Sequence, residues 1–210
     1  MSVFEQIAQF KVVPVIAIES SDAALSLADA LIAGGLPIAE ITFRTAAAAD
    51  VIRKMTSERP GLLVGAGTIL TLDNLKAAID SGAKFGVAPG CNPKTIEAAQ
   101  KMDFPFVPGV CTPSDVELAL SYGCKVLKFF PAGVMGGLDM LKSLIGPYGH
   151  MGVQFMPTGG VSPANLGSYL GTKGVIACGG TWIATKDDIS GGKWDLITSR
   201  CREVAELTHG

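Results

Sequence analysis

The sequence predicts an α/β fold, a single (β/α)8 barrel (TIM barrel) with an extra N-terminal helix, formed by residues 1–210 as one domain. Three observations lead to this fold class. Short apolar segments recur at fairly even spacing, and segments with helical spacing alternate with them. Such alternation is typical of parallel strands joined by right-handed crossovers. The apolar segments contain few polar residues, as expected of strands that are covered on both faces of a sheet.

Eight segments have the length and composition of strands. Each is short and mostly apolar, and each ends near Gly, Pro, Thr or Arg, which is where a turn or a polar strand end is expected. The segments are VVPVIAI from Val12, IAEITFR from Ile38, LLVGAGT from Leu62, KFGVAPG from Lys84, FPFVPGV from Phe104, KVLKFFP from Lys125, VQFMPTGG from Val153 and GVIACGG from Gly174.

The segments between these strands begin and end like helices. SSDAALSLADALIAGG, TLDNLKAAIDSG and TPSDVELALSYG open with Ser or Thr, carry an acid in the first turn and stop at Gly. NPKTIEAAQKM has Pro93 in its first turn, where proline is tolerated, and SPANLGSYL is a shorter example. SVFEQIAQF adds a helix below the barrel, and Trp194 to Leu207 form the last helix. An open doubly wound sheet is the alternative. The chain is short for a barrel of typically ~250 residues, so we expect short loops.

The composition argues against several classes of function. The net charge is −2 and Lys and Arg are dispersed, so we expect no nucleic-acid partner. His150 and His209 are far apart in the chain, which argues against a metal site built on histidines. No apolar run is long enough to span a membrane, and the N-terminus does not resemble a secretory signal. The 5 cysteines include no CxxC pair, which indicates reduced thiols and predicts a soluble cytoplasmic protein.

Polar residues near the predicted strand ends mark the candidate site, because barrel active sites lie at the C-terminal ends of the strands. In IAEITFRT, Glu40, Thr42 and Arg44 alternate and therefore point to one side. Arg44 could hold a carboxylate in a bidentate fork. Glu40 lies deeper, where burial suits proton transfer. The alternative is a salt bridge with a purely structural role.

Lys128 lies in the middle of the apolar strand KVLKFFP. An ammonium group in apolar surroundings is costly and loses its proton more easily, and only the neutral amine attacks a carbonyl. The neighbouring phenylalanines provide a dry wall, so we interpret Lys128 as a nucleophile. In the alternative, the lysine crosses the barrel wall and pairs with an acid, for which Glu40 is the candidate.

Two Gly-Gly turns follow the seventh and eighth predicted strands. Barrels often bind phosphate there, on backbone N–H groups and a helix N-terminus, although tight loop geometry alone is the alternative. The turns consist of Thr158, Gly159 and Gly160, followed by a short helix from Ser162, and of Gly179, Gly180 and Thr181.

Two weaker signals lie after the third and fourth strands. In GAGT, Gly65 and Gly67 leave room for a ligand beside the Thr68 hydroxyl, and Pro89 could form a flat apolar wall. A carboxylate clamp, a deep acid, an isolated lysine and a phosphate cradle thus meet at one barrel mouth. This combination indicates an enzyme that acts on a phosphorylated keto acid through an imine.

These residues also resemble a known family, the bacterial 2-keto-3-deoxy-6-phosphogluconate (KDPG) aldolases, which often also cleave 4-hydroxy-2-oxoglutarate (KHG). The matching segments run in the family's order from about Val12 to Trp182. They are VVPVIAI, AEITFRT, GAGT, APG, VPGV, TPS, LKFFPA, PTGGV and ACGG.

The resemblance implies a homotrimeric class I aldolase of the Entner-Doudoroff pathway, a lyase that needs no metal and no cofactor beyond the lysine imine. It assigns Lys128 as the Schiff-base lysine and Glu40 as the general acid/base. The family usually has a serine where this chain has Thr181, and the threonine keeps the hydroxyl group and adds a methyl group. The implied substrate contacts are Arg44, Thr68 and Thr158 for the pyruvate carboxylate region, Pro89 and Phe130 for the pyruvyl carbons, and Gly159, Gly160, Gly180 and Thr181 for the phosphate.

Other functions fit parts of the sequence. A metal-dependent sugar-phosphate epimerase would need His and Asp ligands, and the strand ends carry no histidine. A non-catalytic phosphate-binding module would not need the Lys–Glu–Arg set, and a metal-assisted class II aldolase would not need the isolated lysine. If the chain is a class I aldolase, the alternative substrate is the galactonate stereoisomer of KDPG.

Overall fold

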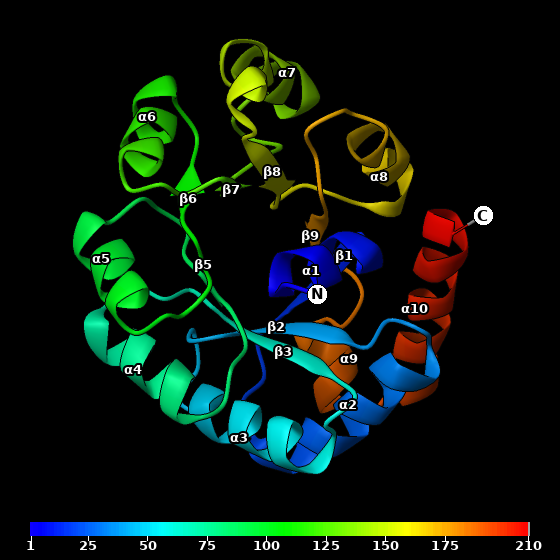
Figure 1. Ribbon diagram of the computed structural model, residues 1–210. Coiled ribbons are helices and arrows are strands. Elements are labelled where there is room, and N and C mark those ends of the chain that lie inside the picture. The colour runs from blue at the N-terminus through cyan, green and yellow to red at the C-terminus, as the bar shows by residue number, and fades with distance from the viewer. Residues whose placement is uncertain (210) are drawn as a thin grey trace.

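The computed structural model describes residues 1–209, and its strands lie inside a ring of helices (Figure 1). The strands of the described residues are β1 (Val12–Ile16), β2 (Ile38–Thr42), β3 (Leu63–Gly67), β4 (Gly86–Val87), β5 (Phe106–Val107), β6 (Gly109–Val110), β7 (Val126–Phe129), β8 (Gln154–Pro157) and β9 (Cys178–Gly180). The helices are α1 (Val3–Phe10), α2 (Ala24–Ala33), α3 (Ala48–Glu58), α4 (Leu72–Asp80), α5 (Pro93–Lys101), α6 (Pro113–Ser121), α7 (Gly137–Tyr148), α8 (Pro163–Leu170), α9 (Lys186–Ser190) and α10 (Trp194–His209).

All strand pairs are parallel, and they form one sheet with the order β5-β4-β3-β2-β1-β9 and another with the order β6-β7-β8. The predicted strand from Phe104 is split into β5 and β6, because Pro108 between them has no N–H to donate. Two isolated bridges, Phe155↔Val175 and Thr158↔Gly179, connect the β8 region with β9 and the segment before it. The α/β class with parallel strands is confirmed. The eight predicted strands appear as two sheets rather than as one continuous ring.

Helices form where the start and stop residues predicted them. Thr71 and Thr112 accept hydrogen bonds from backbone N–H groups in the first turns of α4 and α6. At the N-terminus, Ser2 and Glu5 form a capping box that starts α1, the predicted extra helix, which lies in front of the strands in Figure 1. The segment from Ser20 differs from the prediction. Its serine caps a short 3-10 turn (Ser21–Ala23), and α2 follows that turn without a side-chain cap.

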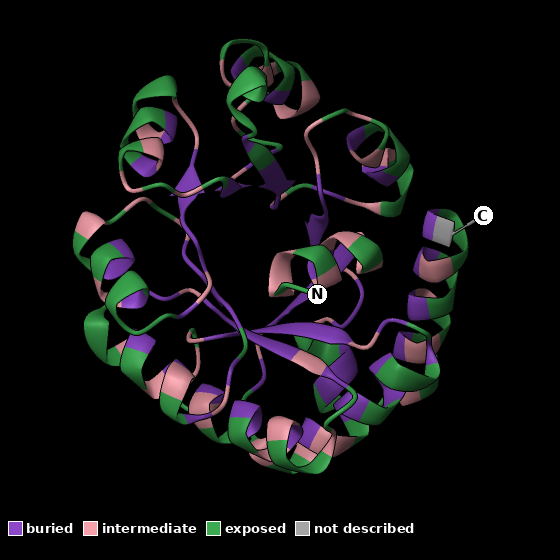
Figure 2. Ribbon diagram, in the orientation of Figure 1, coloured by how far each residue is buried: buried purple, intermediate pink, exposed green. Residues whose placement is uncertain are grey.

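The core lies between the strands and the inner faces of the helices. Figure 2 shows the strands buried and the helices exposed mainly on their outer faces. Phe85, Phe129 and Phe155 are fully buried, and each such side chain contributes roughly 1.5–3 kcal/mol through burial. Within the described residues, no helix combines the length and the apolar character needed to cross a membrane.

Candidate functional site

A buried ion pair joins two strands that belong to different sheets. Glu40 of β2 is fully buried and Lys128 of β7 is 5% exposed. The Lys128 Nζ lies 3.3 Å from Glu40 Oε1. The backbone partners of Glu40 are Val15 and Gly65, so the contact with β7 is made by side chains alone. The sequence predicted that these two groups face one cavity, and the structure brings them together.

The surroundings of the lysine are apolar, as the sequence predicted. The Phe130 ring centroid lies 5.3 Å from the Lys128 Nζ, and Phe129 is fully buried. Glu40 Oε2 is buried and has no hydrogen-bond partner among the described residues. A buried ion pair gains little net stability, whereas an unpartnered buried oxygen is costly. The site therefore has a free acceptor beside the lysine, which is the arrangement that a proton-transferring carboxylate needs.

Glycine makes the position of the carboxylate possible. A Cβ atom on Gly67 would lie 2.7 Å from the Cγ and Cδ atoms of Glu40, and one on Gly65 would overlap the Phe85 ring. The sequence reasoning reserved this space for a ligand, but the side chains of Glu40 and Phe85 fill it. Gly67 thus fixes the depth at which Glu40 can sit.

Thr42 supports Arg44, the residue predicted to bind a carboxylate, and the sequence did not indicate this supporting role. Thr42 is buried, and its Oγ1 donates to the Ile16 carbonyl at 2.9 Å. The same oxygen accepts a hydrogen bond from Arg44 Nε at 3.1 Å. Arg44 is exposed. Arg44 does not take part in the salt bridge of Glu40, whose basic partner is Lys128.

Thr68 and Pro89, the residues predicted at the ends of the third and fourth strands, have different surroundings. Thr68 follows Gly67 at the end of β3 with φ +57°, a backbone conformation that is rare for a β-branched residue. Such strain is typical of functional sites. Pro89 lies on a hollow of about 300 Å³ formed by the segments after β3 and β4, and the lining of that hollow includes neither Lys128 nor Glu40. Outside that hollow, the Pro89 backbone packs against Gly109, where a Cβ would overlap it, and Gly109 is the strand partner of Lys128.

The two predicted Gly-Gly turns lie next to each other, but Gly179 and Gly180 are the last two residues of β9, paired with β1, and do not form a turn. Thr158 and Gly179 form a bridge, and a Cβ on Gly179 would lie 2.8 Å from the Thr158 Cγ2. Gly159 and Gly160 have φ values of +87° and +83°, a conformation that favours glycine. The backbone N–H of Gly133 donates to the Gly159 carbonyl at 2.8 Å. These contacts bring the turns after β7, β8 and β9 to one rim.

The predicted phosphate residues differ in exposure. Gly180 is buried under the ring of Trp182, whereas Gly160 and Thr181 are exposed. The Phe130 ring lies against Gly159, since a Cβ there would be 3.4 Å from its Cδ2 and Cε2 atoms. Phe130 therefore spans the distance between the lysine and the Gly159–Gly160 turn.

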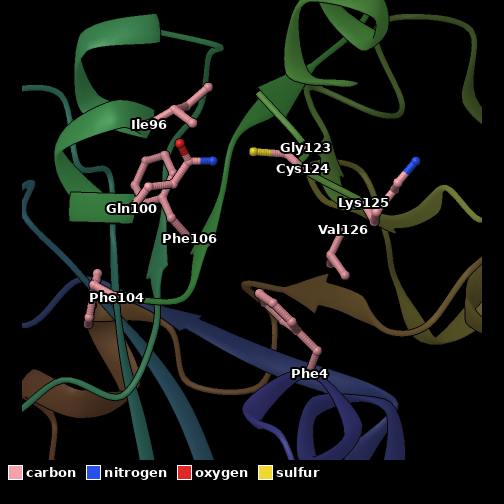
Figure 3. Close-up of a pocket in the computed structure, with 9 residues that line it drawn as sticks. All are labelled: Phe4, Ile96, Gln100, Phe104, Phe106, Gly123, Cys124, Lys125 and Val126. Atoms are coloured by element: carbon pink, nitrogen blue, oxygen red, sulfur yellow. The ribbon is translucent and has the colours of Figure 1, made fainter. Parts of the chain in front are cut away.

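A separate pocket of about 330 Å³ lies at the N-terminal ends of β5 and β7 (Figure 3). Phe4 of α1, Phe104 and Phe106 contribute its aromatic lining, and none of the predicted site residues lines it. Lys125 is exposed there and donates to the Met151 carbonyl at 3.1 Å, as expected for a lysine on the opposite side of the strand from Lys128. This pocket has no acid–lysine pair, so we place the chemistry at the other end of the strands.

The cysteines behave as small apolar residues. Burial raises the pKa of the Cys178 and Cys201 thiols to about 12. Burial is also the main reason why the pKa of Cys91 is raised to about 11. These thiols are therefore protonated near neutral pH. Among the side chains that the structure describes, no three His, Cys, Asp or Glu residues gather as metal ligands.

The chain is similar to known aldolases over nearly its full length. A family model described as KDPG and KHG aldolase matches residues 3–200. A 2-dehydro-3-deoxy-phosphogluconate aldolase of Haemophilus influenzae is 45% identical over 205 residues, which cover 98% of this chain and 96% of that protein. The KHG/KDPG aldolase of Escherichia coli (strain K12) is 41% identical over 195 residues, covering 93% of this chain and 91% of that protein.

Solved structures agree with these sequence matches. A KDPG aldolase from Legionella pneumophila, with pyruvate captured at low pH as a covalent carbinolamine intermediate, has a TM-score of 0.92 and 36% identity. It covers 97% of this chain, which in turn spans 98% of it. The Zymomonas mobilis ZM4 enzyme with 3-phosphoglycerate has a TM-score of 0.88 and 36% identity, with 98% and 96% coverage.

Proposed function

The chain belongs to the KDPG and KHG aldolase family, and from this premise we propose that it is a class I aldolase acting through an imine on Lys128. It cleaves KDPG to pyruvate and glyceraldehyde 3-phosphate, and KHG to pyruvate and glyoxylate. The observation that carries the proposal is the buried pair of Lys128 and Glu40, 3.3 Å apart beside Phe130. The carbinolamine captured in the Legionella enzyme supports covalent chemistry of this kind in a relative.

The first half of the reaction builds the electron sink. Lys128, as the free amine, adds to the C2 carbonyl of the keto acid and forms a carbinolamine. Glu40 Oε1 is placed to accept the proton that the ammonium group must lose. Loss of water from the carbinolamine then gives a cationic imine, which withdraws electrons from the C3–C4 bond.

The second half breaks the carbon–carbon bond. Glu40, directly or through a water molecule, accepts the proton of the C4 hydroxyl group, and the C3–C4 electron pair moves into the imine. The aldehyde leaves and an enamine of pyruvate stays on Lys128. Protonation of its methylene carbon and addition of water release pyruvate and restore the amine. A positioned acid/base contributes on the order of 10²–10⁴ in rate.

Three groups of residues bind the substrate in this proposal. Arg44, oriented by Thr42, offers its terminal amino groups to the carboxylate. Thr68 and Thr158 serve the same end of the substrate, and Phe130 and Pro89 pack against the pyruvyl carbons. The phosphate sits on the rim formed by Gly159, Gly160, Gly180 and Thr181. The 3-phosphoglycerate in the Zymomonas mobilis structure supports a phosphorylated ligand in a relative.

The proposal also covers the barrel architecture, the location, the metal requirement and the oligomeric state of the protein. We infer that the two sheets are arcs of one (β/α)8 barrel, because only Pro108 separates β5 from β6 and two bridges link the β8 region to β9. We treat residues 1–210 as one domain. The protein is cytoplasmic, as its free cysteines favour, and needs no metal, since the imine is the electron sink. The homotrimer rests on the family resemblance alone.

The test is a coupled assay of pyruvate release. KDPG, its galactonate stereoisomer, KHG and an unphosphorylated sugar analogue are offered at equal concentrations, with and without EDTA. We expect KDPG to be the best substrate and EDTA to have no effect. A preference for the stereoisomer would correct the substrate, and release of pyruvate from none of the four would overturn the function in favour of a binding module.

A further inference from the structure

A charged cluster outside the proposed catalytic pair lies beyond the end of β9. It consists of Thr185, Asp188, Lys193 and Arg200, and we refer to it as the Arg200 cluster. Asp188 of α9 is 4% exposed, and its Oδ2 lies 2.6 Å from Nη1 of Arg200 in α10. Lys193 Nζ lies 3.3 Å from Oδ1, and the Thr185 hydroxyl also donates to the carboxylate. Hydrogen bonds from Thr185 and Arg200 hold the pKa of Asp188 well below its usual range.

The same guanidinium group holds the loop after β9. Arg200 Nη1 donates to the carbonyl oxygens of Trp182 at 3.0 Å and Ile183 at 3.4 Å. The Trp182 ring in turn covers Gly180, because a Cβ there would lie 2.7 Å from its Cη2 atom. The cluster is thus connected, through Trp182, to the end of β9 at Gly180 and to Thr181, which follows it.

We propose that Arg200 and Asp188 are positioning residues for phosphate binding by the backbone at Gly180 and Thr181, an inference that rests on the proposed function. A backbone anion site binds tightly only when its N–H groups are already oriented, since ordering a loop on binding costs affinity. Arg200 supplies this order by binding two successive carbonyls, and Asp188 fixes the guanidinium group. Neither residue is a hydrogen-bond or ion-pair partner of Lys128 or Glu40 among the described residues, so the cluster affects the phosphorylated half of the substrate selectively.

The test compares phosphorylated and unphosphorylated substrates. For Arg200→Met, which keeps much of the side-chain length and removes the donors, we expect the ratio of kcat/KM for KDPG to kcat/KM for KHG to fall about tenfold, mostly through KM. Inorganic phosphate should compete with KDPG about tenfold more weakly than in the wild type. Arg200→Lys should recover part of both effects, because it keeps one cationic donor. Trp182→Leu, which spares the ion pair and uncovers Gly180, should shift the ratio in the same direction if Arg200→Met does not fold.

The matched control is Arg59→Met, which removes a surface ion pair with Asp29 in which Nε lies 2.5 Å from Oδ1. It should leave the substrate ratio at the wild-type value. Equal losses on KDPG and KHG in both test variants would show that the cluster only stabilises the fold, and an unchanged ratio would also overturn the proposal. If the wild type itself releases no pyruvate from KDPG while still cleaving KHG, the proposed phosphate substrate is at fault rather than the positioning role.

Discussion

The two halves of the proposed site are built in different ways. The half that does the chemistry consists of side chains in the interior, with Glu40 fully buried and Lys128 5% exposed. The half that receives the phosphate consists of backbone turns at the rim, where Gly160 and Thr181 are exposed. Interior side chains tolerate few changes because their neighbours cannot move, whereas a backbone site depends on the shape of its loop. We therefore expect a change at Thr181 to be tolerated better than a change at Glu40.

Among the variants that test this difference between the two halves, we expect replacement of Glu40 to have the largest effect on the rate. Glu40→Gln keeps the size of the side chain and removes its ability to exchange a proton. We expect kcat to fall by about 10²–10⁴ with little change in KM, measured by pyruvate release at saturating KDPG. A variant that raises only KM would show that Glu40 binds substrate and does not carry the proton.

The second prediction concerns the glycine that makes room for the acid. In Gly67→Ala, the new methyl group overlaps Glu40, and displacement of the carboxylate by about 1 Å is expected to lower kcat about 10²-fold. Gly61→Ala is the matched control, because a Cβ there meets nothing within 4 Å. Thermal unfolding of both variants separates a displaced acid from a damaged fold. A Gly67→Ala enzyme with wild-type kcat would contradict the account.

A smaller effect is expected from the residue that orients Arg44. Thr42→Val removes the oxygen that accepts from Arg44 Nε, while Thr42→Ser keeps it. A hydrogen bond to a charged group contributes about 1.5–3 kcal/mol, so we expect KM for both KDPG and KHG to rise about tenfold in the valine variant, with kcat little changed. The serine variant should stay near the wild-type KM. Equal KM values in the two variants would show that Thr42 does not orient Arg44 for carboxylate binding.

The smallest effect concerns stability at the rim. The pKa of Asp188 is held below its usual value by hydrogen bonds from Thr185 and Arg200, so the folded state binds its proton less readily than the unfolded state. This contribution is present above the usual pKa of 3.8 and is lost as the pH falls below it. Asp188→Asn should therefore lose less stability than the wild type between about pH 5 and about pH 3 in urea unfolding. Parallel curves would contradict the ion-pair account.

The sequence predicted the contact between Lys128 and Glu40 because the signal for each residue is local. A lysine inside an apolar strand and an acid in an alternating strand are visible in a few neighbouring residues, and the ion pair follows if both strands face one interior. The family of the chain was also predicted correctly from these motifs. The strand predicted from Phe104 is divided at Pro108. This proline is visible in the sequence, but the prediction did not take into account that proline has no N–H group to donate.

Contacts between distant segments could not be predicted in the same way. Arg200 lies 12 residues beyond Asp188, on another helix, and only packing brings it to the Trp182 carbonyl. The space above Gly65 and Gly67 was assigned to a ligand because a sequence shows that a side chain is missing and not what fills its place.

The central claim is that Lys128 forms an imine with the keto acid, and reduction with borohydride tests it most directly. The protein is incubated with pyruvate, reduced and digested, and the peptides are analysed by mass spectrometry, with Lys128→Met as the control. The account predicts one pyruvyl adduct, on Lys128, that needs both pyruvate and borohydride and is absent from the control. An adduct on another lysine such as Lys125, or no adduct in an enzyme that still releases pyruvate from KDPG, would contradict it.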